Sequence, residues 1–423
     1  MRFLPKAYAA IFRCYPVLGL IGAVSFLATA GWALVIPVLP LYLAVELGIA
    51  PGTIGFIFGA YAASETLSKT PFGIIGDHLG RKPVALTGLA LALCVPVLML
   101  CARHPLHFVI LQIINGLSIA AFWPTMAALT ADRVAPEHRA TALTIYNTSY
   151  LIALGLGPPA GIFLSHLAGS NRAALLAAAA VTGLGLLLAV MLPDRRDRRE
   201  SPPVDRRRVL VAAFAGGIPA QLRFIRASRP LGALLAVSVL QMFAVGFLGP
   251  VFVLFIRQHL GFDEADISRA ILVPVILVAL SSIPLGRLAD RIGYTRAARL
   301  AFLAGAAGIL LLPVAENLWL LTAFIGLLGL AYVFGAPAWT AIASALAPTA
   351  SRGTAIAALS TMQSLGFILG SPAGGYLYQI AGPAAPFYAC GALLILCVLL
   401  IAVLIRLPRA AAADAETGEQ RTA

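Results

Sequence analysis

Twelve apolar runs divide this sequence, and each is about as long as a bilayer is thick. A helix needs about 20 apolar residues to cross a hydrocarbon core of about 30 Å, because it rises about 1.5 Å per residue. The runs lie at 17–44, 53–75, 84–101, 106–131, 141–166, 171–193, 230–256, 267–286, 297–314, 318–347, 354–379 and 386–405. Only 11% of the 423 residues are charged, whereas soluble domains carry about a quarter. The sequence therefore predicts an all-α polytopic membrane protein with twelve transmembrane helices.

The second half of the chain repeats the first at a constant shift of 213 positions. Asp77 corresponds to Asp290, and the segment GPPAG at 157–161 corresponds to GSPAG at 370–374. Six helices per half give both halves the same orientation, so they are parallel repeats. We predict four parts: an N-terminal six-helix bundle at 1–193, a basic cytosolic linker at 194–229, a C-terminal six-helix bundle at 230–407, and a disordered cytosolic tail at 408–423.

Basic residues are distributed unevenly between the two sides of the predicted helices. A cytosolic N-terminus places 25 of the 30 Lys and Arg in cytosolic segments, ten of them between Arg195 and Arg229. The other five are Arg103, Arg172, Arg257 and Arg269 in outer connections, and Lys69 within a span. This asymmetry follows the positive-inside rule. The net charge of +13 is therefore explained by topology, and we expect no nucleic-acid partner. The pattern predicts a multi-pass protein of the plasma (inner) membrane with both termini cytosolic.

The connection after the second run, GIIGDHLGRKP at 73–83, carries a burst of charge that recurs after the eighth run. The twelve helices, the parallel halves and this loop resemble the major facilitator superfamily (MFS), most closely its twelve-helix proton-coupled drug and metabolite exporters. The resemblance implies that the two halves surround a central cavity. The signature positions are Gly73, Asp77, Gly80, Arg81 and Lys82, repeated at Gly286, Asp290, Arg291 and Gly293.

Each residue type in the first loop has a physical role. Gly73 allows close approach to a neighbouring helix, and Gly80 permits a positive φ where the chain reverses. The resemblance implies that the loop latches the two halves in the outward-facing state. Asp77 would then face the inner start of helix 11, and Arg81 would pair with Asp132. The alternative is that these charges only fix the topology.

The run ALGLGPPAGIFL at 153–164 resembles a motif in the fifth helix of proton-coupled exporters. Gly157, Pro158 and Gly161 match that motif. Proline bends a helix and glycines allow tight packing, so such a helix can seal the cavity against leaks. Ordinary helix packing remains an alternative, because the second half has a similar run. Gln112 stands where these exporters usually have an arginine, so their proton mechanism does not transfer residue by residue.

Glu65 and Lys69 form the one acid–base pair inside the predicted spans. Glu65 is 12 residues from both Thr53 and Asp77, which places it near the bilayer midplane. Each ionised group there costs about 2.5–3.5 kcal/mol, so both should face the protein interior and pair. The shift of 213 maps them to Val278 and Ser282, so the pair is not shared scaffold. A substrate or a conformational change that separates them can drive proton uptake, and a static structural pair is the alternative.

Further cavity candidates are polar or aromatic residues on helices 1, 4, 5, 7, 10 and 11. They suggest an aromatic, weakly polar pocket that suits amphipathic compounds better than sugars or strongly anionic metabolites. These candidates are Trp32, Gln112, Asn115, Trp123, Tyr146, Asn147, Tyr150, Gln241, Tyr332, Trp339 and Gln363.

The sequence thus predicts a secondary active transporter that is not an enzyme, with efflux of small amphipathic compounds, as in multidrug resistance, coupled to protons. We expect a monomer whose partners are the lipid bilayer and a small-molecule substrate. No nucleotide-binding loop is present, and His104 and His107 lack a supporting carboxylate or thiol. We therefore expect no cofactor and no metal, with the proton as coupling ion. An importer or facilitator of a small metabolite is the main alternative, and a non-transporting membrane sensor or an enzyme is a remote one.

Overall fold

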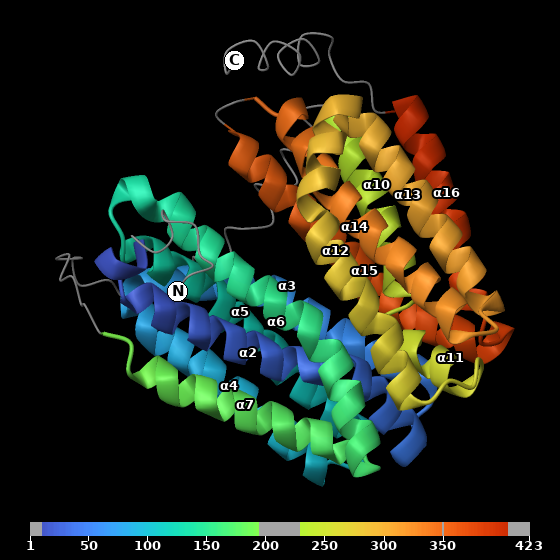
Figure 1. The fold of residues 1–423 in the computed structure, drawn as a ribbon, viewed down its shortest axis with the longest axis horizontal. Coiled ribbons are helices and arrows are strands. Elements are labelled where there is room, and N and C mark those ends of the chain that lie inside the picture. The colour runs from blue at the N-terminus through green and yellow to red at the C-terminus, as the bar shows by residue number, and fades with distance from the viewer. Residues whose placement is uncertain (1–10, 194–228, 349–350, 405–423) are drawn as a thin grey trace. The chain divides into compact units, whose positions relative to one another are not determined.

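The computed structural model describes residues 11–193, 229–348 and 351–404, and twelve of the helices in these residues have 18 residues or more (Figure 1). The first six are α2 (Val17–Leu41), α3 (Pro51–Leu79), α4 (Arg81–Cys101), α5 (Pro105–Asp132), α6 (Arg139–Ala168) and α7 (Arg172–Val190). The other six are α10 (Arg229–Gly246), α12 (Glu264–Ile292), α13 (Tyr294–Leu311), α14 (Leu318–Leu346), α15 (Arg352–Ala381) and α16 (Ala385–Leu404). The prediction of an all-helical membrane protein is confirmed. The predicted tail at 408–423 and the linker at 194–229, apart from Arg229, lie outside the described residues.

Helix α3 differs from the other long helices in composition. Eleven candidate spans among the described residues are long and apolar enough to cross a membrane, and α3 is the long helix that is not among them. Its middle turns contain Ser64, Glu65, Thr66, Ser68 and Lys69, and these side chains lower its mean hydropathy. Among the described long helices, the one that is too polar to be a candidate span is therefore the one that contains the predicted charged pair.

The helix boundaries reproduce the internal repeat. Adding 213 to the ends of α3 gives 264–292, which are the ends of α12, and adding it to α6 gives 352–381, the ends of α15. The six described residues with positive φ are all glycines and form three pairs at the same shift: Gly48 with Gly261, Gly80 with Gly293, and Gly169 with Gly382. Because L-residues rarely adopt this conformation, both halves need glycine at the same three turns.

The predicted span at 230–256 is not one continuous helix. It consists of α10, which ends at Gly246, and a short helix α11 (Phe252–Gln258), with turns between them. Gly249 and Pro250 lie in this break, and their counterparts in the first half are Ile36 and Pro37. Pro37 lies inside α2, so proline alone does not end the helix. The added glycines at 246 and 249 lower the helix propensity around the proline and account for the break.

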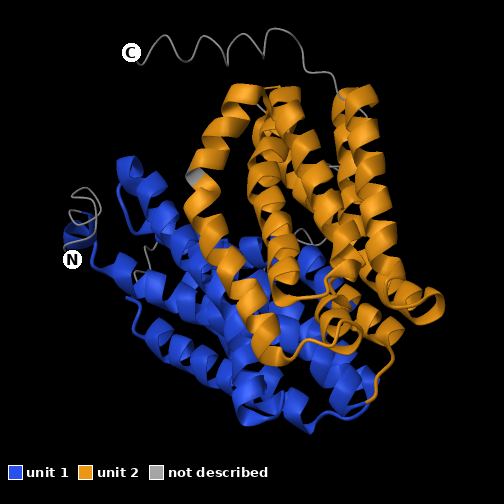
Figure 2. Cartoon of the chain, turned by 45° about the vertical axis from the view of Figure 1, so that its right-hand side comes forward, with its two compact units in different colours: residues 1–47, 60–217 blue, residues 48–59, 218–423 orange. Residues whose placement is uncertain are grey.

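The described chain divides into two compact units (Figure 2). Unit 1 comprises residues 1–47 and 60–217, and unit 2 comprises residues 48–59 and 218–423. The first turns of α3 therefore group with unit 2, whereas the rest of that helix belongs to unit 1. The sequence-based domain boundaries keep all of α3 in the first half and remain a prediction.

Each unit has its own apolar core. In unit 1 the core side chains come from α2, α4, α5, α6 and α7, and they include Leu18, Leu89 and Phe122. In unit 2 they come from α10, α12, α13, α14, α15 and α16, and they include Leu234 and Trp339. Helix α2 packs on α6 and α7 in unit 1, as α10 packs on α15 and α16 in unit 2. The two units thus use the same helix pairs for packing.

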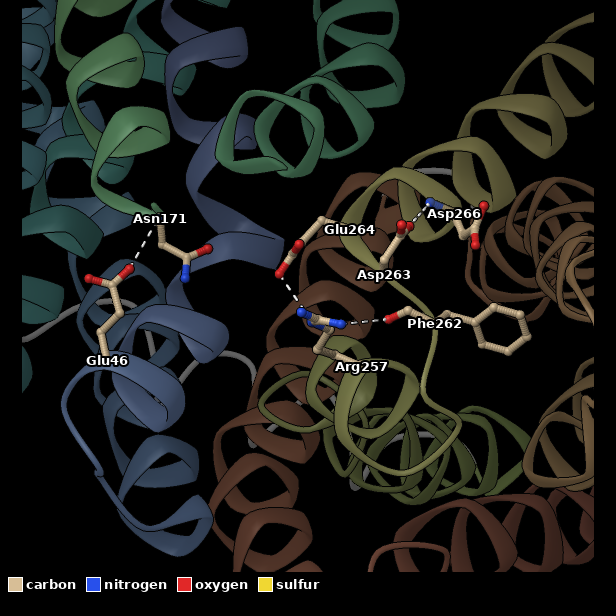
Figure 3. A network of polar contacts seen from close by, with 7 residues as sticks. All are labelled: Glu46, Asn171, Arg257, Phe262, Asp263, Glu264 and Asp266. Atoms are coloured by element: carbon tan, nitrogen blue, oxygen red, sulfur yellow. Dashed lines mark hydrogen bonds and ion pairs between the residues drawn. The ribbon is translucent and has the colours of Figure 1, made fainter. Parts of the chain in front are cut away.

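Ion pairs and caps hold helix ends at the connections that the sequence places on the outer side (Figure 3). In unit 1, Glu46 accepts a hydrogen bond from the backbone N–H of Asn171 at 3.0 Å, beside its ion pair with Arg172. A carboxylate is favourable there because it lies at the N-terminus of α7. In unit 2, Arg257 donates to Glu264 at 3.1 Å, and Asp263 caps α12 by accepting from the Asp266 N–H. Arg172 and Arg257, two of the arginines predicted on this side, therefore have local structural partners.

Candidate functional site

The signature loop between α3 and α4 is held by ion pairs within unit 1. Arg81 lies 3.2 Å from Asp77 and 2.6 Å from Asp132 at the end of α5. Gly80 has φ +99°, so the predicted backbone reversal at this glycine is confirmed. A Cβ added at Gly73 would have no described atom within 4 Å, and its close approach to a neighbouring helix remains a prediction. The loop thus ties three helix ends together, and its role as a latch remains a prediction.

Lys82 has a contact that the sequence analysis did not anticipate. Its ammonium group donates to the carbonyl oxygens of Val190 at 2.9 Å and Leu192 at 2.5 Å. Arg133 donates to the carbonyl of Pro193. The last carbonyls of a helix have no intrahelical donor, and cations are favourable at that end. The two cations therefore cap the end of α7, directly before the predicted linker.

We expect the Arg81–Asp132 ion pair to contribute modestly to stability. Both side chains are partly exposed, so solvent screens their attraction. A double-mutant cycle with Arg81→Met and Asp132→Asn should give a coupling free energy of about 0.5 kcal/mol. Thermal unfolding of the purified full chain measures it. A coupling of several kcal/mol would show that the pair stabilises the fold far more than exposed pairs do.

The glycines of the exporter-like motif make close helix packing possible. A Cβ at Gly161 would overlap the Leu34 carbonyl group, and one at Gly157 would overlap Ala33, so α6 touches α2 backbone to backbone. Gly370 and Gly374 on α15 make the same approach to Phe243 and to Phe247, at the end of α10. Because both units share this contact, the structure gives these glycines a packing role. Pro158, beside them, is half-buried.

Glu65 and Lys69 form an ion pair with 2.9 Å between Oε1 and Nζ. They are one helical turn apart, with the acid on the N-terminal side, which is the favourable order. Glu65 is 16% exposed and Lys69 is 47% exposed. The carboxylate is therefore the more enclosed partner, and the lysine reaches from it towards more open space.

Helix α5 approaches α3 very closely beside this pair. A Cβ at Gly116 would lie 2.6 Å from the Tyr61 carbonyl oxygen and 2.8 Å from the Glu65 nitrogen, and Ser64 donates to the Ile113 carbonyl at 2.8 Å. In unit 2, Gly329 occupies the corresponding position and faces the Val278 side chain. The same helix contact therefore carries a carboxylate in unit 1 and a methyl group in unit 2.

Aromatic side chains from four helices gather beside Glu65. Trp32 on α2 lies 6.3 Å from Tyr61 and 5.3 Å from Trp123, and Trp123 on α5 lies 4.6 Å from Tyr150 on α6, measured between ring centroids. The Tyr61 side chain interacts with both Glu65 and Trp32. We call Trp32, Tyr61, Trp123 and Tyr150 the aromatic cluster. It brings three predicted cavity candidates together next to the charged pair.

A small pocket adjoins the aromatic cluster inside unit 1. It lies between α2, α4, α5 and α7, and Trp32, Asn115 and Thr182 line it together with apolar residues. Asn115 donates to Gln112 at 2.9 Å, and Gln112 is buried. The pocket wall is thus largely apolar, with Asn115 and Thr182 as its polar side chains.

The remaining cavity candidates have different environments. Trp339 is 2% exposed, packs in the core of unit 2 and donates to Ser238 at 2.9 Å. Tyr146 is likewise a core residue, and its hydroxyl donates to the Trp123 carbonyl. Sequence periodicity places a side chain on a helix face but does not identify the helix that packs against it. It therefore does not distinguish a core face from a cavity face. Asn147 and Tyr332 are exposed, and Gln241 and Gln363 are half-buried.

Sequence reasoning missed Tyr61 and Ser64 as parts of this site. Tyr61 precedes Glu65 by four residues, so helical spacing places both on one face. The spacing of four residues could therefore have identified Tyr61 as a neighbour of Glu65. The polar contact of Ser64 with α5 had no comparable signal, because it depends on which helix packs there.

Twelve long helices in two repeated halves, with a charged pair and aromatic rings inside one half, define a polytopic membrane transporter. The family model of the Major Facilitator Superfamily matches residues 21–246 and 234–423. The chain belongs to the Major Facilitator Superfamily. It is accordingly a transporter and not an enzyme, it is embedded in the lipid bilayer, and its substrate is a small molecule.

Several bacterial proteins are similar over most of the chain. Multidrug resistance protein 2 of Bacillus subtilis is 26% identical over 364 residues, covering 84% of this chain and 87% of that protein. The multi-drug resistance efflux pump PmrA of Streptococcus pneumoniae is 26% identical over 379 residues, covering 86% and 90%. Among solved structures, the nucleoside transporter NupG has a TM-score of 0.74 at 15% identity, covering 94% of this chain and 98% of that one. The structural likeness supports the fold alone.

Proposed function

We propose that this chain is a proton-coupled exporter of small amphipathic compounds. It works by alternating access of its two six-helix halves, as a monomer in the plasma (inner) membrane with both termini cytosolic. The names of the relatives, a multidrug resistance protein and a multi-drug resistance efflux pump, support export. The surroundings of the charged pair, with aromatic rings and few other charges, support amphipathic substrates.

The observation that carries the coupling proposal is the Glu65–Lys69 pair. The Glu65 carboxylate is largely enclosed and is paired with one flexible cation, Lys69. The counterpart of Glu65 in unit 2 is Val278. A scaffold requirement would apply to both halves, whereas a coupling site is needed once. Release of Lys69 leaves an enclosed carboxylate without a counter-ion, and binding a proton removes that unfavourable charge. Protonation of Glu65 when Lys69 is released, and loss of that proton when the pair forms again, couple proton movement to substrate export.

Expression of the chain in a bacterium that lacks its own efflux pumps tests the proposed export. We expect growth to tolerate higher concentrations of amphipathic compounds such as ethidium, and cells to retain less ethidium after loading. Cells with an empty vector provide the control. Increased retention of ethidium would instead favour the importer or facilitator, and unchanged retention and growth across a chemically diverse panel would contradict export.

A further inference from the structure

Trp123 carries a buried hydrogen-bond donor without an acceptor. No described residue accepts a hydrogen bond from its indole Nε1–H, and that nitrogen is shielded from solvent. Buried tryptophans usually donate this proton, because leaving it unpaired costs about 1–3 kcal/mol. Trp339, the buried tryptophan of unit 2, does so by donating to Ser238. A rigid indole cannot rotate its N–H to a new acceptor as a hydroxyl can, so the unpaired donor needs an explanation.

The Trp123 ring is held firmly in its orientation. Trp32 and Tyr150 contact it with interplanar angles of 83° and 80°, in the edge-to-face geometry that aromatic rings prefer. The Tyr146 hydroxyl donates to the Trp123 backbone carbonyl at 3.1 Å. Two ring contacts and one hydrogen bond to its backbone thus position Trp123 with its N–H unpaired.

The second half of the chain does not repeat this arrangement. The shift of 213 maps Trp123 to Ala336 and Trp32 to Val245. The pocket residues Asn115 and Thr182 map to Leu328 and Ile395. The Leu328 side chain packs closely on Gly308, because a Cβ there would lie 3.0 Å from its Cδ2. Unit 1 therefore has polar side chains where unit 2 has apolar ones.

Trp32 is the neighbour through which a ligand can reach Trp123. Its ring contacts Trp123 edge to face and also lines the small pocket. A ligand that displaces the Trp32 ring from this contact reaches the Trp123 ring and its N–H. The Trp32 and Tyr150 rings then offer surfaces for stacking, and the N–H offers one directed hydrogen bond.

We propose that Trp123 forms a substrate subsite for a planar aromatic group that bears an uncharged hydrogen-bond acceptor, such as a ring nitrogen or a carbonyl oxygen. The indole N–H donates to that acceptor, and the neighbouring rings hold the aromatic plane. The subsite distinguishes aromatic compounds that have a hydrogen-bond acceptor from those that lack one. Glu65 and Lys69 respond instead to the charge of the compound. The subsite rests on the proposed function only in that its ligand is transported.

Binding of two matched probes tests this subsite without requiring transport. Quinoline and naphthalene have the same shape, but only quinoline has a ring nitrogen that accepts a hydrogen bond, and it is uncharged at neutral pH. Equilibrium dialysis with the purified full chain, corrected for protein-free micelles, gives both dissociation constants. We expect wild type to prefer quinoline about tenfold, which corresponds to about 1.4 kcal/mol. Trp123→Phe should lose this preference for quinoline.

Trp319→Phe is the matched control, because it removes an indole N–H from an exposed position of the chain and should keep the preference. Thermal unfolding shows whether Trp123→Phe is folded, and Trp123→Tyr is a second variant that lacks the N–H but keeps a large ring. A quinoline preference that survives in both variants, or is missing in wild type, would overturn the subsite. Because dialysis reports binding alone, failure of the efflux proposal leaves this result interpretable.

Discussion

Replacing Gly161 by leucine is expected to prevent assembly of the N-terminal bundle. Even a single methyl group at this position would overlap the Leu34 carbonyl, and the Leu34 C and Cα atoms would lie only 3.0 Å away. These are backbone atoms of a packed helix, so they cannot move aside as a flexible side chain can. Overpacking in a core typically costs about 1–3 kcal/mol, and separation of α2 from α6 along their contact adds to that cost.

Gly19→Leu provides the matched control for this variant. Gly19 lies on α2 in the same unit, and a Cβ there would have no atom within 4 Å. Size-exclusion chromatography of the full chain fused to a fluorescent protein measures the folded, monodisperse fraction. We expect Gly161→Leu to be aggregated and Gly19→Leu to resemble wild type. Similar profiles for both variants would contradict the backbone contact between α2 and α6.

Glu65→Gln is expected to abolish acceleration of efflux by a proton gradient. The amide has the shape of the carboxylic acid but cannot exchange a proton, so the step that couples transport to the gradient is lost. The gradient-dependent part of the rate should fall by about tenfold or more, which corresponds to at least about 1.4 kcal/mol. Glu46→Gln removes another ion-paired, half-buried carboxylate and should retain the acceleration.

A double variant separates coupling from a purely structural role of the pair. Glu65→Gln alone leaves Lys69 without its counter-ion, which can destabilise the helix bundle. Combining it with Lys69→Gln removes both charges and should restore thermal stability. We expect the double variant to be stable and still insensitive to the gradient. Recovery of the gradient response along with stability would show that the pair is structural.

Much of the fold follows from local sequence, because helix formation and turn conformation depend mainly on residues close together in the chain. The three glycine pairs with positive φ lie where both halves turn, and the ends of α3 and α6 recur in α12 and α15 at the same shift. The break between α10 and α11 was not predicted. It arises where two glycines precede a proline, whereas α2 continues through the corresponding proline.

The candidate site was only partly predictable. The Glu65–Lys69 pair follows from helical spacing and from the cost of charge in a membrane. The positions of Trp339 and Tyr146 in the unit cores were not predictable, since their burial depends on which helices pack around them. The unpaired N–H of Trp123 and the cap of α7 by Lys82 involve residues far apart in sequence. Such contacts follow from tertiary packing, for which spacing within one helix gives no signal.

The central claim, proton-coupled export through Glu65, is tested most directly in proteoliposomes. Vesicles loaded with ethidium, whose permanent charge prevents passive redistribution with pH, are placed in acidic buffer with the membrane potential clamped by valinomycin and equal potassium. Wild type should release ethidium faster with the proton gradient than without it, and Glu65→Gln should show the same slow release in both conditions. Equal rates for wild type with and without the gradient, or an undiminished gradient response in Glu65→Gln, would contradict the claim.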